Sequence, residues 1–198
     1  ISSINNGNMQ IIFCQTSDFA GLTGTRFGGT EVTPPTGGGD EGGEDPVTPP
    51  SGGEGQYDSD LSWTLGTNSY DNTSSTPQKA IVNNEMVENI LKLGKAKEGG
   101  SATVTIPAGT TKVGFYAVAW KDNNSTVLTC KAGSSTVSLN LVANVGAVGN
   151  PDPTYEITVT ESDYYTVDIP DGVTSMTVET SGSSNCRAIL FGLKAVTE

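Results

Sequence analysis

The sequence predicts an all-β fold, a jelly-roll β-sandwich of about nine or ten strands. Residues 111–120 are apolar on both alternating faces, which indicates a central strand covered on two sides. Over residues 57–198, short candidate strands follow one another at regular intervals, and turns rich in Gly, Pro and Asn separate nearly all of them. Helical periodicity is confined to residues 83–90, where we expect a helical turn or two.

The chain divides into three segments. Residues 1–30 form the end of a preceding domain, where Asn6-Gly7 predicts the turn of a β-hairpin. Residues 31–56 hold six acids, no base and two Pro-Pro pairs, and they have almost nothing apolar to bury, so we expect a disordered or extended linker. Residues 57–198, about 140 residues, form the folded domain. Because the chain starts at Ile1 without a signal peptide, we expect a longer protein whose upstream part carries further domains and the export signal or lipid anchor.

The predicted strands of the folded domain are 61–65, 90–93, 102–106, 112–120, 126–130, 136–141, 155–160, 164–169, 175–179 and 187–196. In the first long apolar strand, Val113, Phe115 and Ala117 face the core. In the last strand, Ile189, Phe191 and Leu193 share one face, and we expect this strand beside residues 112–120.

The composition excludes several function classes. The chain has no histidine, which removes the usual general base and zinc ligand, and with them the Ser-His-Asp type of triad. A net charge of −12 without a basic stripe argues against nucleic-acid binding. No apolar run reaches the roughly 18 residues of a membrane-spanning helix, so we expect no membrane insertion.

Its three cysteines, Cys14, Cys130 and Cys186, have no metal-site spacing. Cys130 and Cys186 pair if their strands are neighbours; buried free thiols are the favoured alternative.

Neither carboxylates nor metals provide a strong site. Acid pairs such as Glu85/Glu88 and Glu161/Asp163 lie in turns or polar stretches, where solvated surface is the favoured interpretation, so we expect no enzyme activity. We also expect no cofactor. Calcium remains an alternative at residues 122–124 or at Asp58/Asp60, although ordinary turn-forming Asp and Asn explain these positions better.

Aromatic side chains are the remaining functional signal, because sugar rings stack on flat aromatic faces while polar side chains bind the hydroxyls. Trp120 leads into a polar loop, and one of the neighbours Tyr164 and Tyr165 must face away from the other. A tryptophan at the end of a strand is also often a core residue. The candidate ligand-binding residues are Trp120, Tyr116, Asp122, Asn124 and Tyr165.

Several stretches together resemble a known module. They are Trp63-Thr64, LKLG at 91–94, SATVTIPAGTTKVGFYAVAW at 101–120, YEITVTESDYYTV at 155–167 and RAILFGL at 187–193. This combination resembles the C-terminal galactose-binding-like β-sandwich of multidomain exported surface lipoproteins of Bacteroides-type bacteria, and residues 1–14 resemble the closing hairpin of an OB-like barrel. The resemblance implies a carbohydrate-binding or adhesion unit at the outer-membrane surface or outside the cell, and it implies no catalytic residues.

Three hypotheses follow. The first is a non-catalytic binding module of an exported protein, with a glycan as partner. The second is a structural or adhesive spacer, which predicts that Trp63, Tyr116 and Trp120 are all buried. The third is an accessory domain of a nuclease or glycan hydrolase whose active site lies upstream.

Overall fold

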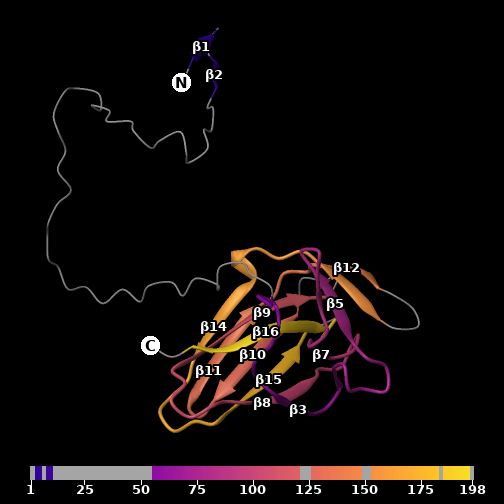
Figure 1. Cartoon of the computed structure of the whole chain (residues 1–198), viewed down its shortest axis with the longest axis vertical. Coiled ribbons are helices and arrows are strands. Elements are labelled where there is room, and N and C mark those ends of the chain that lie inside the picture. Colours follow the sequence, from indigo (N-terminus) through magenta and orange to yellow (C-terminus); the bar gives the residue numbers. More distant parts are fainter. Residues whose placement is uncertain are drawn as a thin grey trace, which may run out of the picture. The chain divides into compact units, whose positions relative to one another are not determined.

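The computed structural model describes residues 55–120, 126–148, 153–182 and 185–196, and the backbone of residues 3–5 and 8–10 (Figure 1). The predicted linker, apart from Gly55 and Gln56, lies outside these residues. Strands β1 (Ser3–Asn5) and β2 (Asn8–Gln10) pair antiparallel, with Asn5 opposite Asn8. This pairing is the hairpin that Asn6-Gly7 predicts; its membership of a preceding OB-like domain stays a prediction.

Two five-stranded sheets form the sandwich. The outer sheet contains, in spatial order, β11 (Ser135–Asn140), β10 (Val127–Ala132), β15 (Ser175–Ser181), β8 (Ser101–Thr105) and β3 (Trp63–Leu65). The central sheet contains β14 (Tyr164–Asp168), β9 (Lys112–Ala119), β16 (Ala188–Val196), β7 (Leu91–Leu93) and β4 (Ser69–Tyr70). A 3-10 turn, η2 (Glu161–Asp163), leads into β14.

The strand pairing confirms the predicted jelly roll. Strands β10 and β11, which follow each other in the sequence, pair antiparallel. Around them, in order of increasing sequence separation, β9 pairs with β14, β8 with β15 and β7 with β16, all antiparallel. Successive pairs alternate between the outer and the central sheet. This nesting is the pattern of an eight-stranded jelly roll, to which β3 and β4 add one edge strand per sheet.

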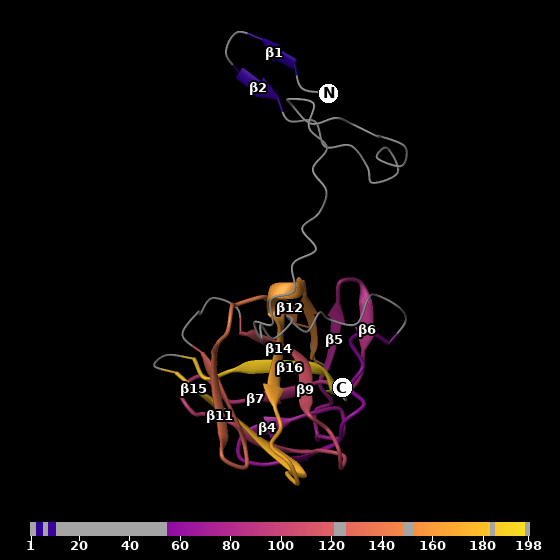
Figure 2. The ribbon, with the colours of Figure 1, turned by 90° about the vertical axis from the view of Figure 1, so that its left-hand side faces the viewer.

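A third, four-stranded sheet is the main departure from the sequence prediction. This small sheet has the order β12 (Val145–Val148), β13 (Thr154–Ile157), β5 (Lys79–Val82) and β6 (Glu85–Val87). It is built from two antiparallel pairs, β5–β6 and β12–β13, joined by parallel pairing of β13 with β5. Figure 2 shows the layers, with β11 and β15 on one side, β9, β14 and β16 in the middle, and β5 and β6 on the other.

The helical prediction for residues 83–90 is wrong. Asn83 and Asn84 form the two-residue turn of the β5–β6 hairpin, and both have positive φ, 48° and 71°. Asparagine tolerates this conformation better than most residues do. The side chain of Asn83 also donates hydrogen bonds to the Tyr57 hydroxyl at 2.8 Å and to the Val159 carbonyl at 3.0 Å, which anchor the turn.

The two-sided burial of residues 113–119 is confirmed, and the small sheet is its cause. Phe115, which is 0% exposed, lies in the core between the outer and central sheets, together with Val113 and Ala117. Tyr116, which is 3% exposed, lies on the opposite face, in a second core between the central and small sheets. A strand covered by apolar residues on both faces is the expected middle layer of three.

The last strand lies beside β9, as predicted, but a β-bulge changes which face one of its residues takes. The register between β16 and β9 shifts between Phe191 and Lys194, and Gly192 has a φ of +61°. Ile189 and Phe191 face the second core, whereas Leu193 joins Leu190 in the first. The prediction that Leu193 shares a face with Phe191 is therefore wrong, because the extra residue of the bulge reverses the alternation.

Cys130 and Cys186 are both buried free thiols, which is the favoured alternative of the sequence analysis. Burial raises the pKa of the Cys130 thiol to about 12, so this side chain acts as a small apolar core residue.

Candidate functional site

Of the predicted ligand-binding residues, the three that the structure describes do not share one site. Tyr116 lies inside the second core, where its ring stacks on Phe191 with centroids 5.6 Å apart and its hydroxyl accepts a hydrogen bond from Gln56 Nε2 at 3.0 Å. Tyr165 is partly exposed and faces the opposite side of the central sheet, where its ring lies 6.2 Å from that of Phe115. Asp122 and Asn124 lie outside the described residues.

Trp120 is partly exposed and packs at the margin of the second core. Its indole meets the ring of Tyr155 edge-on, with centroids 5.4 Å apart. The guanidinium carbon of Arg187 lies 4.4 Å from the centroid of the Trp120 ring, and the Lys92 ammonium lies 5.8 Å from it. The same ammonium lies 4.8 Å from the centroid of Tyr70. We call Tyr70, Lys92, Trp120 and Arg187 the Trp120 cluster.

Strand register explains why residues from four segments meet here. Tyr70 is opposite Lys92, and Lys92 is opposite Ile189, whose side chain lies in the second core. Paired residues share a face of a sheet, so Tyr70 and Lys92 lie on the face that the small sheet covers. Arg187 is two residues before Ile189, and its carbonyl accepts the backbone N–H of Trp120 at 3.0 Å. The Trp120 cluster therefore marks the place where the second core reaches the surface.

The cluster offers hydrogen-bond donors without matching acceptors. Asn185 Oδ1 accepts both the backbone N–H of Arg187, at 3.1 Å, and its Nε–H, at 2.9 Å. Within the described ranges, no other group hydrogen-bonds to the Arg187 guanidinium, and no group does so to the Lys92 ammonium. Burial lowers the pKa of Lys92, and the charges of Arg187 and Lys95 lower it further.

The buried wall behind the cluster is polar but satisfied. The Tyr155 hydroxyl donates to Gln78 Oε1, and burial raises the pKa of Tyr155 to about 12. Gln78 in turn donates through Nε2 to the Thr76 carbonyl at 2.6 Å. These contacts hold the Tyr155 ring against the indole edge and fix the orientation of Trp120 from behind.

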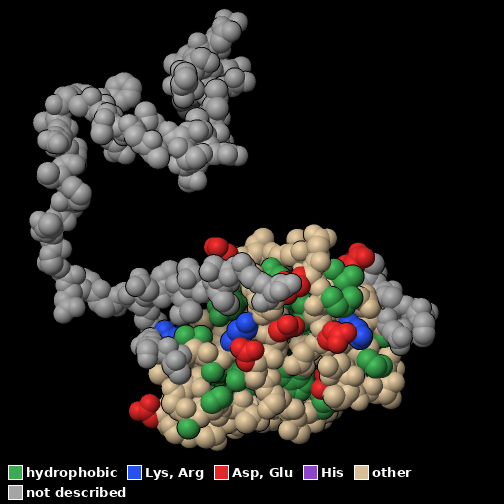
Figure 3. All heavy atoms as spheres, viewed as in Figure 1, with side chains coloured by type: hydrophobic (Ala, Val, Ile, Leu, Met, Phe, Trp, Pro, Cys, Tyr) green, Lys and Arg blue, Asp and Glu red, His purple; other side chains and the backbone are tan. Residues whose placement is uncertain are grey.

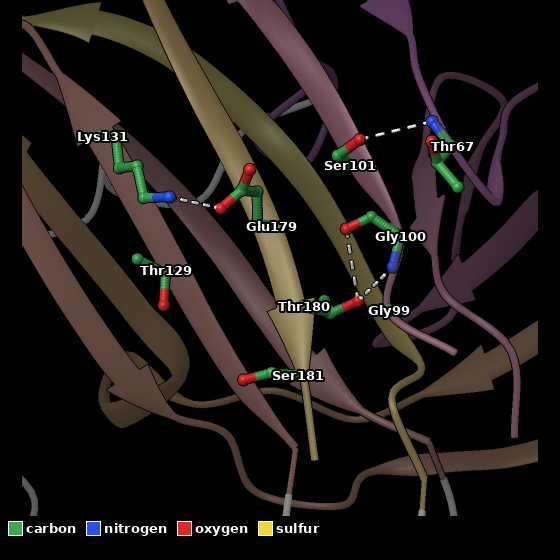
Figure 4. Close-up of a pocket in the computed structure, with 9 residues that line it drawn as sticks. All are labelled: Thr67, Gly99, Gly100, Ser101, Thr129, Lys131, Glu179, Thr180 and Ser181. Atoms are coloured by element: carbon green, nitrogen blue, oxygen red, sulfur yellow. Dashed lines mark hydrogen bonds and ion pairs between the residues drawn. The ribbon is translucent and has the colours of Figure 1, made fainter. Parts of the chain in front are cut away.

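A second surface feature is a shallow hollow of about 310 Å³ on the exposed face of the outer sheet (Figure 4). Hydroxyls, glycines and one ion pair line it: Thr67, Gly99, Gly100, Ser101, Thr129, Lys131, Glu179, Thr180 and Ser181. Lys131 pairs with Glu179 at 2.6 Å, and Thr180 Oγ1 accepts the Gly100 N–H at 2.9 Å. Because the hollow has no aromatic residue and its charges neutralise each other, it is the weaker candidate for a sugar site.

Other kinds of site find little support in the part of the chain that is described. On the face shown in Figure 3, acidic and basic side chains lie interspersed among uncharged ones. Among the described residues, Asp58 and Asp60 included, no group of three or more His, Cys, Asp or Glu side chains could hold a metal ion. No described helix has the length and apolar character needed to cross a bilayer.

Sequence reasoning identified Trp120 but missed Tyr70, Lys92 and Arg187. A local signal existed, because Lys92 interrupts the apolar run Leu91–Leu93 and Arg187 stands at the start of the last apolar strand. What the sequence lacks is the register that places the two cations beside one ring.

No protein-family profile matches the sequence, and no curated protein is significantly similar to it. Among solved structures, the chain resembles the K2 cleaved adhesin domain of Lys-gingipain (TM-score 0.40, 14% identity, covering 66% of this chain and 87% of that one). It also resembles the carbohydrate-binding module TmCBM61 in complex with β-1,4-galactotriose (TM-score 0.34, 14% identity, 69% of this chain and 88% of that one). A third is the enzymatically active domain of tailspike protein 4 of bacteriophage CBA120 (TM-score 0.32, 15% identity, 67% of this chain and 17% of that one). Likenesses this distant identify no ligand.

Proposed function

We propose that residues 57–198 form a non-catalytic carbohydrate-binding module of an exported bacterial surface protein, and that the Trp120 cluster is its binding surface. The observation that carries the proposal is a partly exposed tryptophan that packs on Tyr155 and has two cations over its ring, whose remaining hydrogen-bond donors no described residue uses. The exported setting rests on the resemblance to surface lipoproteins.

This combination suits a sugar. The apolar C–H face of a pyranose stacks on an indole or phenol ring, and the hydroxyls on its edge need polar partners. Trp120 and Tyr70 provide the rings, the Lys92 ammonium provides donors close to both, and the Arg187 guanidinium provides donors beside Trp120. A rigid platform also keeps the entropic cost of binding low, and the buried contacts of Tyr155 supply that rigidity.

The spacer hypothesis agrees less well with how far the aromatic side chains are exposed. It requires Trp63, Tyr116 and Trp120 all to be buried, but only Tyr116 is; Trp63 and Trp120 are both partly exposed. The third hypothesis, an accessory domain of an enzyme, is compatible with the same binding surface. The non-catalytic role is inferred from the missing histidine. The carboxylate pairs do not all lie in solvated turns, as the sequence predicted: Glu85 begins β6, and Asp163 is buried, where its carboxylate accepts the Thr160 N–H at 2.9 Å.

Replacing Trp120 by alanine should abolish most of the affinity for any glycan that the chain binds on a glycan array. Loss of a central stacking residue typically costs about 2 kcal/mol or more, which corresponds to about a 30-fold rise in Kd. Isothermal titration calorimetry on the parent chain and on Trp120→Ala measures this change.

Tyr165→Phe is the matched control, since Tyr165 lies on the other face of the central sheet and should leave Kd unchanged. If the folded parent chain binds no glycan on a broad array, the module is a spacer and the proposal fails.

A further inference from the structure

We infer that the Trp120 cluster selects acidic saccharides, in which a carboxylate or sulfate on the sugar is bound between the Arg187 guanidinium and the Lys92 ammonium. The inference rests on the proposed function, since it names the class of glycan that the same site takes. Uronate and sulfated sugars share the relevant chemistry, a sugar ring that carries a fixed anion.

The first supporting observation is that these two cations have no carboxylate partner in the described part of the chain. Among the other partly buried cations described, Lys79 contacts Glu88 at 3.2 Å and Lys112 contacts Asp168 at 3.8 Å. Lys194 donates to the Gly55 carbonyl at 3.0 Å. Lys92 and Arg187 contact no carboxylate among the described residues, although the chain holds 22 acids and only 10 bases. Two cations over one indole ring, neither paired with a carboxylate of the described residues, form a positive patch that attracts an anion.

The second observation is that the charge of Arg187 opposes the protonated form of Lys92. Burial and the charge of Arg187 both act against protonation of Lys92. An anion placed between the two groups removes this repulsion and gains charge-assisted hydrogen bonds in a partly desolvated site. A neutral sugar would cover the same charges without compensating them.

The third observation concerns geometry and acceptors. Because Asn185 Oδ1 binds Nε and the backbone N–H of Arg187, the guanidinium is held in one orientation and its two terminal amino groups remain available for an oxyanion. Nearby acceptors are already used: Asn185 by Arg187, Gln78 by Tyr155, and Asp71 by Trp63 at 2.9 Å and Thr73 at 2.8 Å. These acceptors of the described residues are therefore taken, whereas a carboxylate or sulfate on the sugar brings its own acceptors for the two cations.

The test compares uronate oligosaccharides with their methyl esters, which keep the ring and lose the charge, and adds sulfated oligosaccharides as a second acidic arm. Calorimetry on the full chain in low salt should give Kd values at least about tenfold lower for the acidic sugars, and this difference should shrink as NaCl is added. If the chain prefers only uronates or only sulfated sugars, that preference identifies the anionic group that the site binds, and either result supports the inference.

Variants separate a specific contact from general charge. Arg187→Gln and Lys92→Gln should each weaken binding of the acidic sugars about tenfold or more and weaken the methyl esters by a smaller factor, so that the preference for the acidic form is reduced. Lys131→Gln, which removes one positive charge from the hollow on the outer sheet, should change neither. A thermal melt of each variant confirms that it is folded. The salt dependence of binding by the parent chain tests the inference even if a variant does not fold.

The possible failures are distinguishable. Equal affinity for acidic and esterified sugars overturns the inference and leaves the proposed function standing. Loss of acidic-sugar binding in Lys131→Gln but not in Arg187→Gln also overturns it, since the anion would then bind on the outer sheet. Absence of binding to any of the sugars by the folded parent chain overturns both.

Discussion

Replacing Phe115 by alanine is expected to lower the free energy of unfolding by about 3–5 kcal/mol, the usual cost of truncating a buried phenylalanine. Phe115 is 0% exposed and lies in the core that joins the outer and central sheets. It sits near the middle of β9, the strand whose two faces contribute to both cores. The side chains around Phe115 therefore have little freedom to move into the cavity that the alanine leaves.

Phe191→Ala should cost a similar amount, about 3–5 kcal/mol, through the second core, because Phe191 stacks on Tyr116. Urea unfolding followed by circular dichroism measures both changes. Met86→Ala is the control: Met86 is 51% exposed on β6, and its loss should change stability by less than about 0.5 kcal/mol. An unchanged urea midpoint for either phenylalanine variant would show that the corresponding core is wrongly assigned.

Replacing Gly94 by alanine is expected to cost at least about 3 kcal/mol, for two separate reasons. Gly94 has a φ of +78°, which alanine adopts only under strain. A Cβ at this position would also lie 1.9 Å from the Cys186 carbonyl oxygen, a backbone atom that cannot move aside without disturbing the start of β16. The backbone N–H of Gly94 in turn donates to the Asn68 carbonyl at 2.8 Å, which ties it in place from the other side.

Gly109→Ala separates the two causes. Gly109 has nearly the same φ, +82°, and nothing lies within 4 Å of the position where its Cβ would be. This variant should lose about 1–2 kcal/mol, the cost of the backbone conformation alone. If the two variants show equal losses in urea unfolding, the close approach of residues 94 and 186 plays no part in stability.

The jelly roll was predictable because its signals are local. Alternating apolar residues and turn chemistry mark each of its long strands, and burial of residues 113–119 on both faces follows directly from their composition. The small sheet was not predictable in the same way. Among its strands only β13 was predicted, as part of 155–160. The other three have three or four residues each, too few for a period to show, and the parallel pairing of β13 with β5 joins segments that are far apart in sequence.

Face assignment failed at Leu193 and site assignment failed at Tyr116, each for a specific reason. Strict alternation assumes an unbroken strand, and the bulge at Gly192 adds one residue. Tyr116 has a ligand-like side chain, but the small sheet covers it, in agreement with the apolar residues on both faces of 111–120. Lys92 and Arg187 meet at Trp120 only through the register of β7 with β16, which one sequence does not reveal.

The binding role of the Trp120 cluster is tested most directly by the fluorescence of Trp120 itself. The chain has two tryptophans, so Trp63→Phe leaves Trp120 as the sole indole reporter. Because Trp120 is partly exposed, acrylamide should quench this variant, and a saturating acidic oligosaccharide should relieve the quenching by covering the ring. Calorimetric binding of the sugar with no change in quenching would place the ligand elsewhere and contradict the assignment of the Trp120 cluster as the binding surface.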